Sequence, residues 1–292
     1  MTTGTLAAHA TRYLLERRGR QEITRSTGMR ISYVLRSLDG SYGTRPMSMF
    51  GARAIERWSA QHPQWKHSTR NTYLSAVREF CRWMLRRKLI KSDPFAELVM
   101  PRRPRPNPRP LPRADIAALL AVVPDARARL IVHLQWGLGL RCCGCANLRI
   151  EDIDLVARSV HVTEKGGHSR RLPLTNDVLR AMDLYLFDHP ATSGPLLRSY
   201  STPWAGVGAA HIGNMVRRWM TDAGIKRRPW DGVSAHALRR TALTETAEAC
   251  GDAFIVQELA GWASPHTAAH YVRRASTERV RNALEKRAAV DR

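Results

Sequence analysis

Two short segments place cationic side chains at spacings that suit an anionic ligand. His236 and Arg239 stand at positions i and i+3, on one face of a helix that Ser234 can cap. Arg141 directly follows an apolar, glycine-containing turn over residues 137–140, where a solvated arginine would be out of place. Because a guanidinium group can pair with two oxygens at once, these residues indicate a phosphate site. A His-x-x-Arg pair alone is weak support, since such pairs arise often by chance.

Three further residues of useful chemistry stand near turns and helix ends. Residues 259–272 set Trp262 and Tyr271 nine positions apart. The glycine pair in residues 164–169 is typical of a tight turn between two strands, which puts Lys165 at a hairpin edge. Each residue also has an ordinary structural explanation, because the aromatic pair can be packing side chains and the lysine can be solvated.

In this order, the motifs resemble the catalytic domain of the tyrosine recombinase, or phage integrase, family over most of residues 113–275. Five motifs in register are far more specific than any single one. The matching positions are Arg141 with Leu148 and the segment Glu151-Asp152-Ile153-Asp154, Lys165 of a Lys-Gly hairpin, the strand Arg170–Leu174, His236, Arg239 and Thr241 of a His-x-Leu-Arg motif, Leu259–Trp262, and Tyr271 at the nucleophile's place. Three positions depart from the family: Trp262 replaces the commoner His, Gly144 replaces Glu, and Arg240 replaces a frequent His.

The resemblance implies that Tyr271 attacks a scissile DNA phosphate, giving a 3′-phosphotyrosyl bond and a free 5′-hydroxyl. Arg141 and Arg239 would bind the negative charge that builds up on the phosphate oxygens. His236 would assist removal of the tyrosine proton, because a phenol of pKa near 10 is mostly neutral at pH 7. Lys165 would protonate the departing 5′-oxygen.

Trp262 would complete this site as a neutral donor, since an indole N–H donates to a phosphate oxygen but cannot shuttle a proton. The resemblance implies no ATP, metal or other cofactor. Cys142 and Cys145 form a Cys-x-x-Cys, but no second ligand pair of suitable spacing follows. We therefore interpret both cysteines as small core residues.

The charge of the chain indicates a polyanionic partner. Its 292 residues carry 47 Lys and Arg against 25 Asp and Glu, a formal charge of +22. Residues 1–100 hold 18 basic and 7 acidic side chains, and residues 101–112 add four arginines among prolines. That segment cannot form helix or sheet, so we interpret it as a linker. It is either a solvated spacer or a basic strap along DNA, through Arg102, Arg103 and Arg105.

Helical periodicity predicts a small all-α domain before this linker. The patterns cover Leu6–Glu16, Met29–Leu38, Ala52–Gln61 and a longer amphipathic run after Ser68-Thr69 with apolar Tyr73, Val77, Phe80 and Met84. On another face of that run Arg78, Arg82 and Arg86 recur every four residues and can meet phosphates. Trp58 and Trp65 are expected in the core rather than stacked on bases.

The second domain is predicted to be mainly helical with a small β element. Asp115–Val122 and Arg127–Gln135 have helical patterns, whereas Ser159–Thr163 alternates like a strand and Arg171–Leu174 is its expected partner. We predict domains at residues 1–100 and 113–292, the latter with a helical tail from about residue 272. The fold class is therefore mainly α with a small β-sheet. The resemblance implies a SAM-like, core-DNA-binding first domain and an α+β catalytic second domain.

The combined expectation is a site-specific DNA recombinase that performs integrase- or excisionase-type strand exchange through a Holliday junction. Its partners would be double-stranded DNA, three further copies in a homotetramer on two DNA sites, and host or accessory DNA-bending factors. Whether the tail docks on its own protomer or on a neighbour stays open. No stretch approaches the roughly 18 apolar residues of a membrane helix, so we expect a cytoplasmic, nucleoid-associated protein without a membrane partner.

Two alternatives stay open at this point. The chain could be a catalytically weak DNA-binding accessory or regulatory protein of the same fold, which Trp262 and Gly144 favour. It could also be a topoisomerase that relaxes DNA by the same phosphotyrosine chemistry.

Overall fold

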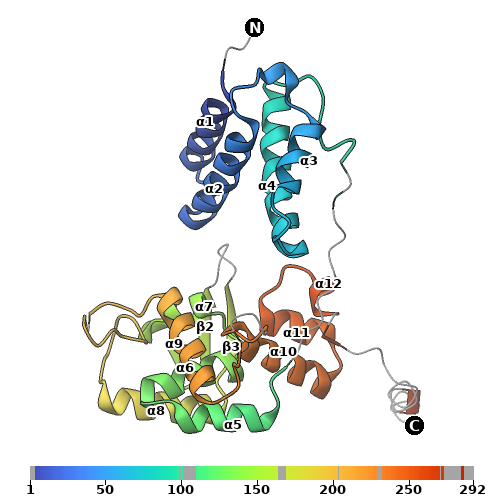
Figure 1. The fold of residues 1–292 in the computed structure, drawn as a ribbon. Helices are drawn as coiled ribbons and strands as arrows, with labels where there is room; N and C mark the ends of the chain where they lie inside the picture. The colour runs from blue at the N-terminus through green and yellow to red at the C-terminus, as the bar shows by residue number, and fades with distance from the viewer. Residues whose placement is uncertain are drawn as a thin grey trace. The chain divides into compact units, whose positions relative to one another are not determined.

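The computed structural model describes residues 4–98, 100, 110–163, 169–202, 204–228, 232–269, 271–272 and 284–285. The chain divides into two compact units, Met1–Arg105 and Pro106–Arg292 (Figure 1). The described residues are mostly helical and include one small sheet, which confirms the predicted fold class. No helix in this part of the chain is long and apolar enough to cross a bilayer.

The described part of the first unit contains four α-helices and a short 3₁₀ helix. These are α1 Leu6–Gly19, α2 Arg25–Tyr42, η1 Met47–Met49, α3 Ala52–Ala60 and α4 His67–Arg86. The hydroxyl of Thr5 accepts from the Ala8 amide and caps α1, and Thr24 caps α2 in the same way. The helices predicted from periodicity are confirmed. Helix α4 begins earlier than expected, so Ser68 and Thr69 lie inside its first turn.

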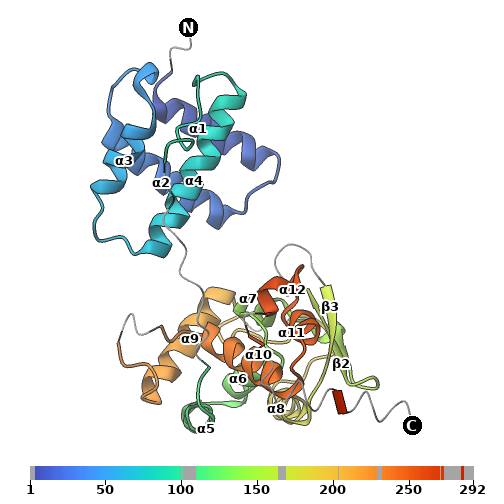
Figure 2. The same ribbon diagram turned by 90° about the vertical axis from the view of Figure 1, so that its right-hand side faces the viewer.

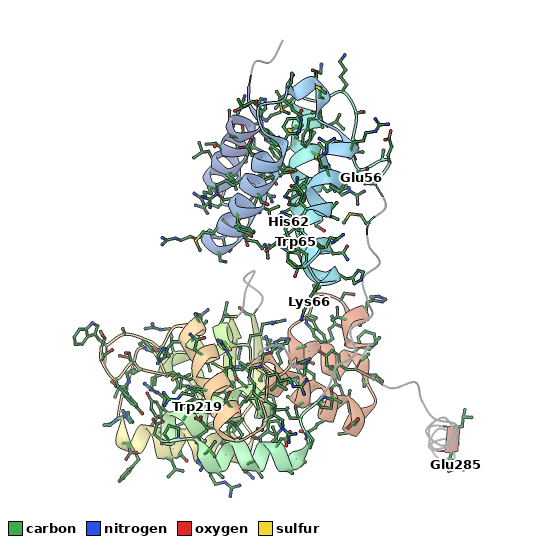
Figure 3. The ribbon with its side chains drawn as sticks, in the orientation of Figure 1. Glu56, His62, Trp65, Lys66, Trp219 and Glu285 are labelled. Atoms are coloured by element: carbon green, nitrogen blue, oxygen red, sulfur yellow. The ribbon has the colours of Figure 1, made fainter. Side chains whose placement is uncertain are left out.

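The core of the first unit lies where α2, α3 and α4 pack together. Trp58, Val77 and Phe80 are fully buried there, which confirms Trp58 as a core residue. Trp65 is half-buried and packs at the edge of this core. Its ring stacks on His62 with the two ring centres 4.0 Å apart and the planes 11° from parallel (Figure 3). The aromatic residues between α3 and α4 therefore hold the two helices together.

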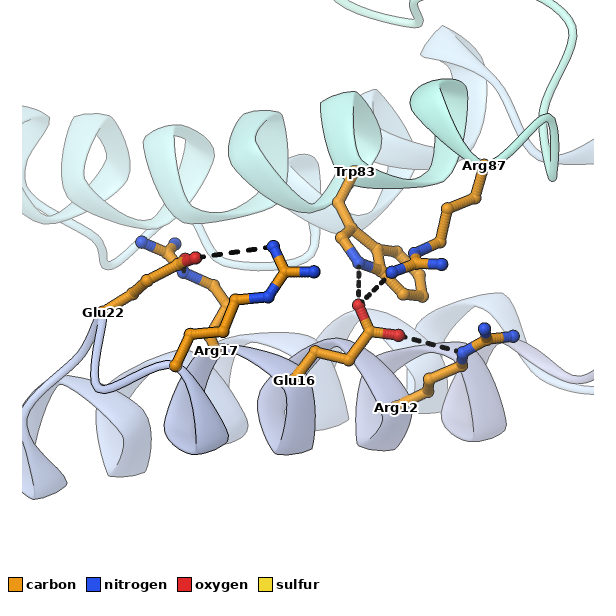
Figure 4. Close-up of polar contacts among 7 residues, drawn as sticks. Arg12, Glu16, Arg17, Glu22, Trp83 and Arg87 are labelled. Carbon is orange, nitrogen blue, oxygen red and sulfur yellow. Dashed lines mark hydrogen bonds and ion pairs between the residues drawn. The ribbon is translucent and has the colours of Figure 1, made fainter.

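A carboxylate on α1 ties that helix to α4. Glu16 accepts a hydrogen bond from the indole N–H of Trp83 (2.9 Å) and another from Nε of Arg12 (3.0 Å), and it also pairs with Arg87 (Figure 4). The Glu16 side chain is only 24% exposed. The Trp83 hydrogen bond is the largest cause of a lowered Glu16 pKa, and the arginine contacts act in the same direction.

We predict that Glu16→Ala destabilises the first unit by about 1–3 kcal/mol, because the indole N–H and two guanidinium groups lose a shared charged acceptor. Hydrogen exchange of α1 and α4 amides in the full chain measures this loss. Glu79→Ala is the matched control, since Glu79 forms an exposed pair with Arg82 and should change stability by less than about 1 kcal/mol. Equal effects of the two substitutions would contradict the prediction. The Glu16 contribution should also fade as the pH falls through its lowered pKa.

The second unit contains the remaining described elements. They are α5 Arg113–Val122, α6 Ala126–Gly137, α7 Cys142–Asn147, η2 Ile150–Asp152, β1 Ile153–Asp154, β2 Ser159–Thr163, β3 Ser169–Pro173, α8 Asn176–Asp188, α9 Ala209–Asp222, α10 His236–Cys250, α11 Ala253–Ala260 and α12 Pro265–Ala268. The predicted strand Ser159–Thr163 is confirmed, as are the helices predicted within α5 and α6.

The sheet is antiparallel with the strand order β1-β2-β3. Val160 pairs with Leu172, and both side chains are buried, as is that of Val162. Alternate residues of β2 therefore point into the core, as the sequence pattern predicts. Two-residue β1 was not predicted, because so short a strand leaves no alternation to detect. The turn at residues 164–168, which carries Lys165, lies outside the described residues.

Helix α6 runs through the middle of this unit. Its residues Leu130, Ile131 and Val132 are fully buried on successive positions, so the helix is covered on all sides. It packs against α8 on one side and α10 on another. Helices α11 and α12 follow α10 and lie beside the strands (Figure 2). Helix α10 is therefore held by two apolar clusters, one around Ala237 and Leu238 and the other around Leu243 and Ala247.

Candidate active site

Arg141, one of the arginines expected in the site, follows the turn that precedes α7. Gly139 has a left-handed backbone (φ 62°), and a Cβ there would lie 3.7 Å from the Ala242 methyl group and 3.8 Å from Leu259. The turn therefore packs against α10 and α11. Arg141 follows with extended backbone (φ −75°, ψ 159°) and is the residue before the first turn of α7. Its side chain is half-buried, as the apolar setting of the sequence predicts.

Arg239 is the most buried charged side chain of the site, with 1% exposure. Its Nη1 donates to the Gly139 carbonyl (2.5 Å) and its Nη2 donates to the Ala260 carbonyl (2.6 Å). These carbonyls belong to segments far apart in the sequence. The guanidinium group thus holds the α7 turn and the end of α11 against α10.

Helix α10 is also bonded to two residues near the start of the second unit, Leu111 and Arg113. The Leu111 amide donates to the hydroxyl of Thr241 (2.7 Å), which in turn donates to the Ala237 carbonyl. One turn further along, Glu245 pairs with Arg113 (2.7 Å). Leu111 inside the predicted linker and Arg113 just after it are therefore bonded to the helix that carries Arg239.

His236 is the first residue of α10 and is exposed. The expected cap at Ser234 is wrong, because the residue before the helix is Ala235 and no side chain caps this end. The Ser234 backbone carbonyl instead accepts from the Ala237 amide at 2.7 Å. The tight turn at 234–237 places His236 at the first position of α10, about one helical turn before buried Arg239.

Trp262 follows the C-terminal turn of α11. Gly261 ends that helix in the left-handed conformation (φ 60°, ψ 44°), and the Trp262 amide donates back to the Gln257 carbonyl. The indole is half-buried, and the centre of its ring lies 5.8 Å from Cζ of Arg239. Trp262 therefore lies beside the guanidinium group of Arg239, and its expected role as a neutral donor stays a prediction.

Tyr271 comes just after the short helix α12, whose start is capped by Ser264. Its amide donates to the Ala268 carbonyl at 2.8 Å, which fixes the backbone at this point. The phenol ring is half-buried and its centre lies 5.5 Å from that of Trp262. Helices α10, α11 and α12 pack on one small apolar cluster that includes Val256 and Ala268.

Burial is the main influence on the Tyr271 phenol and raises its pKa above the ordinary value. The cations of Arg239, Arg240 and Arg141 act in the opposite direction, in that order of strength. Arg240 was not expected to contribute and was noted only as a departure from the family. The structure thus brings Tyr271 and Trp262 together with three guanidinium groups.

We predict that Tyr271 ionises above pH 10, because desolvation of the phenolate outweighs the nearby cations. Nuclear magnetic resonance of ¹³Cζ-labelled tyrosine, assigned with Tyr271→Phe, measures the midpoint. Arg240→Gln should raise it further, since a cation that favours the phenolate is lost. Arg180→Gln is the matched control, because Arg180 is exposed on α8 and pairs with Asp177. A midpoint at or below 10, or equal effects of the two glutamines, would refute this account.

This arrangement suits an anion with several oxygens. Two guanidinium groups can bind a phosphodiester and stabilise the extra charge of its pentacoordinate transition state, and a phenol beside them is chemically able to act as a nucleophile. Cys145 is fully buried, and the Cys142 sulfur accepts from the Gln135 side chain, as expected for packing residues. Within the described ranges, no group of three or more His, Cys, Asp or Glu side chains is placed to hold a metal ion.

The three arginines expected to meet DNA from α4 lie in different environments. Arg78 is half-buried, with its Cζ atom 6.0 Å from the centre of the Phe95 ring. Arg82 is exposed and pairs with Glu79, whereas Arg86 is exposed one turn further along. The linker residues Arg102, Arg103 and Arg105 lie outside the described residues, as does Lys165.

A sequence model described as the phage integrase family matches residues 110–278, which is more than half of the chain. The chain belongs to this family. The match covers every element that builds the site, from the residues before α5 to Tyr271. Membership in the phage integrase family confirms the resemblance inferred from the motifs.

Similar proteins include two named tyrosine recombinase XerC. The one from Neisseria gonorrhoeae is 30% identical over 207 residues, which cover 68% of this chain and 66% of the relative. The one from Rhodospirillum centenum is 32% identical over 222 residues, covering 70% and 61% of the two chains. This chain therefore matches slightly less than two thirds of the length of each relative.

Solved structures show the same fold at lower sequence identity. The Tn1549 transposon integrase, in complex with a circular intermediate DNA, superposes with a TM-score of 0.78 at 17% identity and covers 97% of this chain and 99% of its own. A lambda integrase bound as a dimer to a core site gives a TM-score of 0.75 at 15% identity, covering 92% and 77%. These similarities concern the fold.

Proposed function

We propose that this member of the phage integrase family is a site-specific DNA recombinase that cuts and rejoins strands through a phosphotyrosyl intermediate. The observation that carries the proposal is the half-buried phenol of Tyr271, whose ring centre lies 5.5 Å from that of Trp262 and whose pKa is lowered by the charges of Arg239, Arg240 and Arg141 against the larger effect of burial. The relatives named tyrosine recombinase, and the integrases solved with DNA, support double-stranded DNA as the partner.

In the proposed cleavage step, the phenol oxygen of Tyr271 attacks phosphorus and the bond from phosphorus to the 5′-oxygen breaks. Arg141 and Arg239 stabilise the non-bridging oxygens as their charge grows. The phenol proton leaves to His236, and Lys165 supplies a proton to the departing 5′-oxygen. The phosphotyrosyl ester keeps the bond energy, so a 5′-hydroxyl can reverse the step without ATP.

The proposed whole reaction uses both units. We assign residues 1–100, which lie within the first unit, to the clamp on DNA, residues 101–112 to a basic linker and residues 113–292 to the catalytic domain. A homotetramer on two DNA sites would exchange strands through a four-way junction, with DNA-bending factors as further partners. We propose that the protein acts at the nucleoid.

Tyr271→Phe should abolish the covalent protein–DNA adduct, because the phenyl ring keeps the packing but has no oxygen to attack phosphorus. A nicked suicide substrate that traps the adduct on a denaturing gel measures this. DNA affinity should stay nearly unchanged. Tyr33→Phe is the matched control, since Tyr33 is exposed on α2 and its ring contact with Tyr73 survives the loss of the hydroxyl. An adduct that persists in Tyr271→Phe would exclude this nucleophile, whereas no adduct in any variant would favour an accessory DNA-binding role.

The contribution of Trp262 to the cleavage rate should depend on its indole N–H group rather than on the size of its ring. Trp262→His keeps a donor and should retain most of the cleavage rate, whereas Trp262→Phe keeps a ring without a donor and should lose roughly 10- to 100-fold, about 1–3 kcal/mol for one charged hydrogen bond. Single-turnover cleavage at saturating DNA measures both rates. If Trp262→Phe cleaves faster than Trp262→His, packing is the role of the indole.

A further inference from the structure

Arg170 connects the sheet to the end of helix α11. It is the second residue of β3, where it pairs across the sheet with buried Val162. Its side chain leaves the sheet, and its Nε donates to the Leu259 carbonyl at 3.2 Å. Both terminal nitrogens are buried away from solvent. The guanidinium group thus sits inside the contact between β3 and α11.

The guanidinium group of Arg170 lies directly against Gly261. A Cβ at that position would come within 2.4 Å of Nη1 and 3.0 Å of Cζ of the arginine. Only a residue without a side chain leaves room for this contact. Gly261 is also left-handed (φ 60°), so two separate constraints act on this one position.

The same turn holds the central arginine of the site. Leu259 and Ala260 are neighbours, and their carbonyls accept from Arg170 and Arg239 respectively. Carbonyls at the end of a helix carry partial negative charge, which favours cations there. The residue after Gly261 is Trp262, whose ring contacts both Arg239 and Tyr271. The carbonyls of one short turn therefore accept hydrogen bonds from a guanidinium group on the sheet and from another on α10.

We propose that Arg170 is a positioning residue that fixes the α11 turn, and with it Arg239 and Trp262, relative to strand β3. This inference rests on the proposed function, since β3 begins at Ser169, four positions after Lys165 in the sequence. A shift of α11 against the sheet would change the separation between the phosphate-binding groups and the proposed proton donor. Arg170 itself acts through its neighbours and has no assigned role toward the DNA.

Two substitutions at Arg170 separate this role from simple packing. Arg170→Met keeps the length of the side chain without charge or donor, whereas Arg170→Lys keeps a charge and an ammonium donor group without the planar guanidinium. At saturating DNA, Arg170→Met should lower single-turnover cleavage roughly 10- to 100-fold with unchanged DNA affinity, because small displacements of reacting groups cost this much. Arg170→Lys should recover part of the rate.

Gly261→Ala provides an independent test. It should slow cleavage, because its methyl group collides with the guanidinium. Gly224→Ala is the matched control, since Gly224 is also left-handed (φ 72°) but a Cβ there meets nothing within 4 Å. In the Arg170→Ala background, Gly261→Ala should cost markedly less than in the wild type, whereas the cost of Gly224→Ala should be the same in both.

A readout without DNA separates failure of this inference from failure of the proposed function. The indole N–H resonance of Trp262, assigned with Trp262→Phe, should move in Arg170→Met and Gly261→Ala but not in Gly224→Ala. An unmoved resonance together with wild-type cleavage by Arg170→Met would overturn the positioning role. If the wild-type chain forms no adduct while the resonance moves, the proposed function fails and the positioning role stands.

Discussion

The buried guanidinium group of Arg239 is the constraint on which the candidate site depends. Removing a charge from water costs several kcal/mol unless hydrogen bonds replace the lost hydration. Here the carbonyls of Gly139 and Ala260 supply that replacement, and each belongs to a different segment. The left-handed turn at Gly139 and the α11 terminus must both be in place before Arg239 can be buried. Folding of these two segments is therefore coupled to the placement of the Arg239 guanidinium group, the proposed phosphate ligand.

Burial and nearby charges together determine the protonation state of the Tyr271 phenol. Burial favours the neutral form of Tyr271, and the surrounding cations only partly counteract it. A bound phosphodiester would bring negative charge toward those cations and weaken their help to the phenolate. The proposed attack would therefore need a proton acceptor at the moment of reaction, a role that we propose for the exposed imidazole of His236 at the start of α10. Reactivity would then depend on the assembled complex rather than on a permanently ionised tyrosine.

Local patterns predicted much of this structure, and long-range contacts account for the rest. Helical periodicity located the helices of the first unit, and alternation located β2, because both signals lie within a few neighbouring residues. The motif order located Arg141, Arg239 and Tyr271. The bond from Arg170 to the Leu259 carbonyl spans 89 positions, so no periodicity reports it. The start of α10 was misplaced because a tight backbone turn replaced the side-chain cap expected at Ser234.

The positive charge of the first unit is less uniform than its composition indicates. When an arginine exchanges a carboxylate partner for a phosphate, the binding free energy it contributes is only the difference between the two interaction energies. Arg82 has such a partner in Glu79, and Arg87 has one in Glu16. Arg78 is instead half-buried over an aromatic ring. Arg78 and Arg82 of the α4 arginine repeat are therefore unequal, and the proposed attraction to DNA would depend on which cations keep their acidic neighbours in the complex.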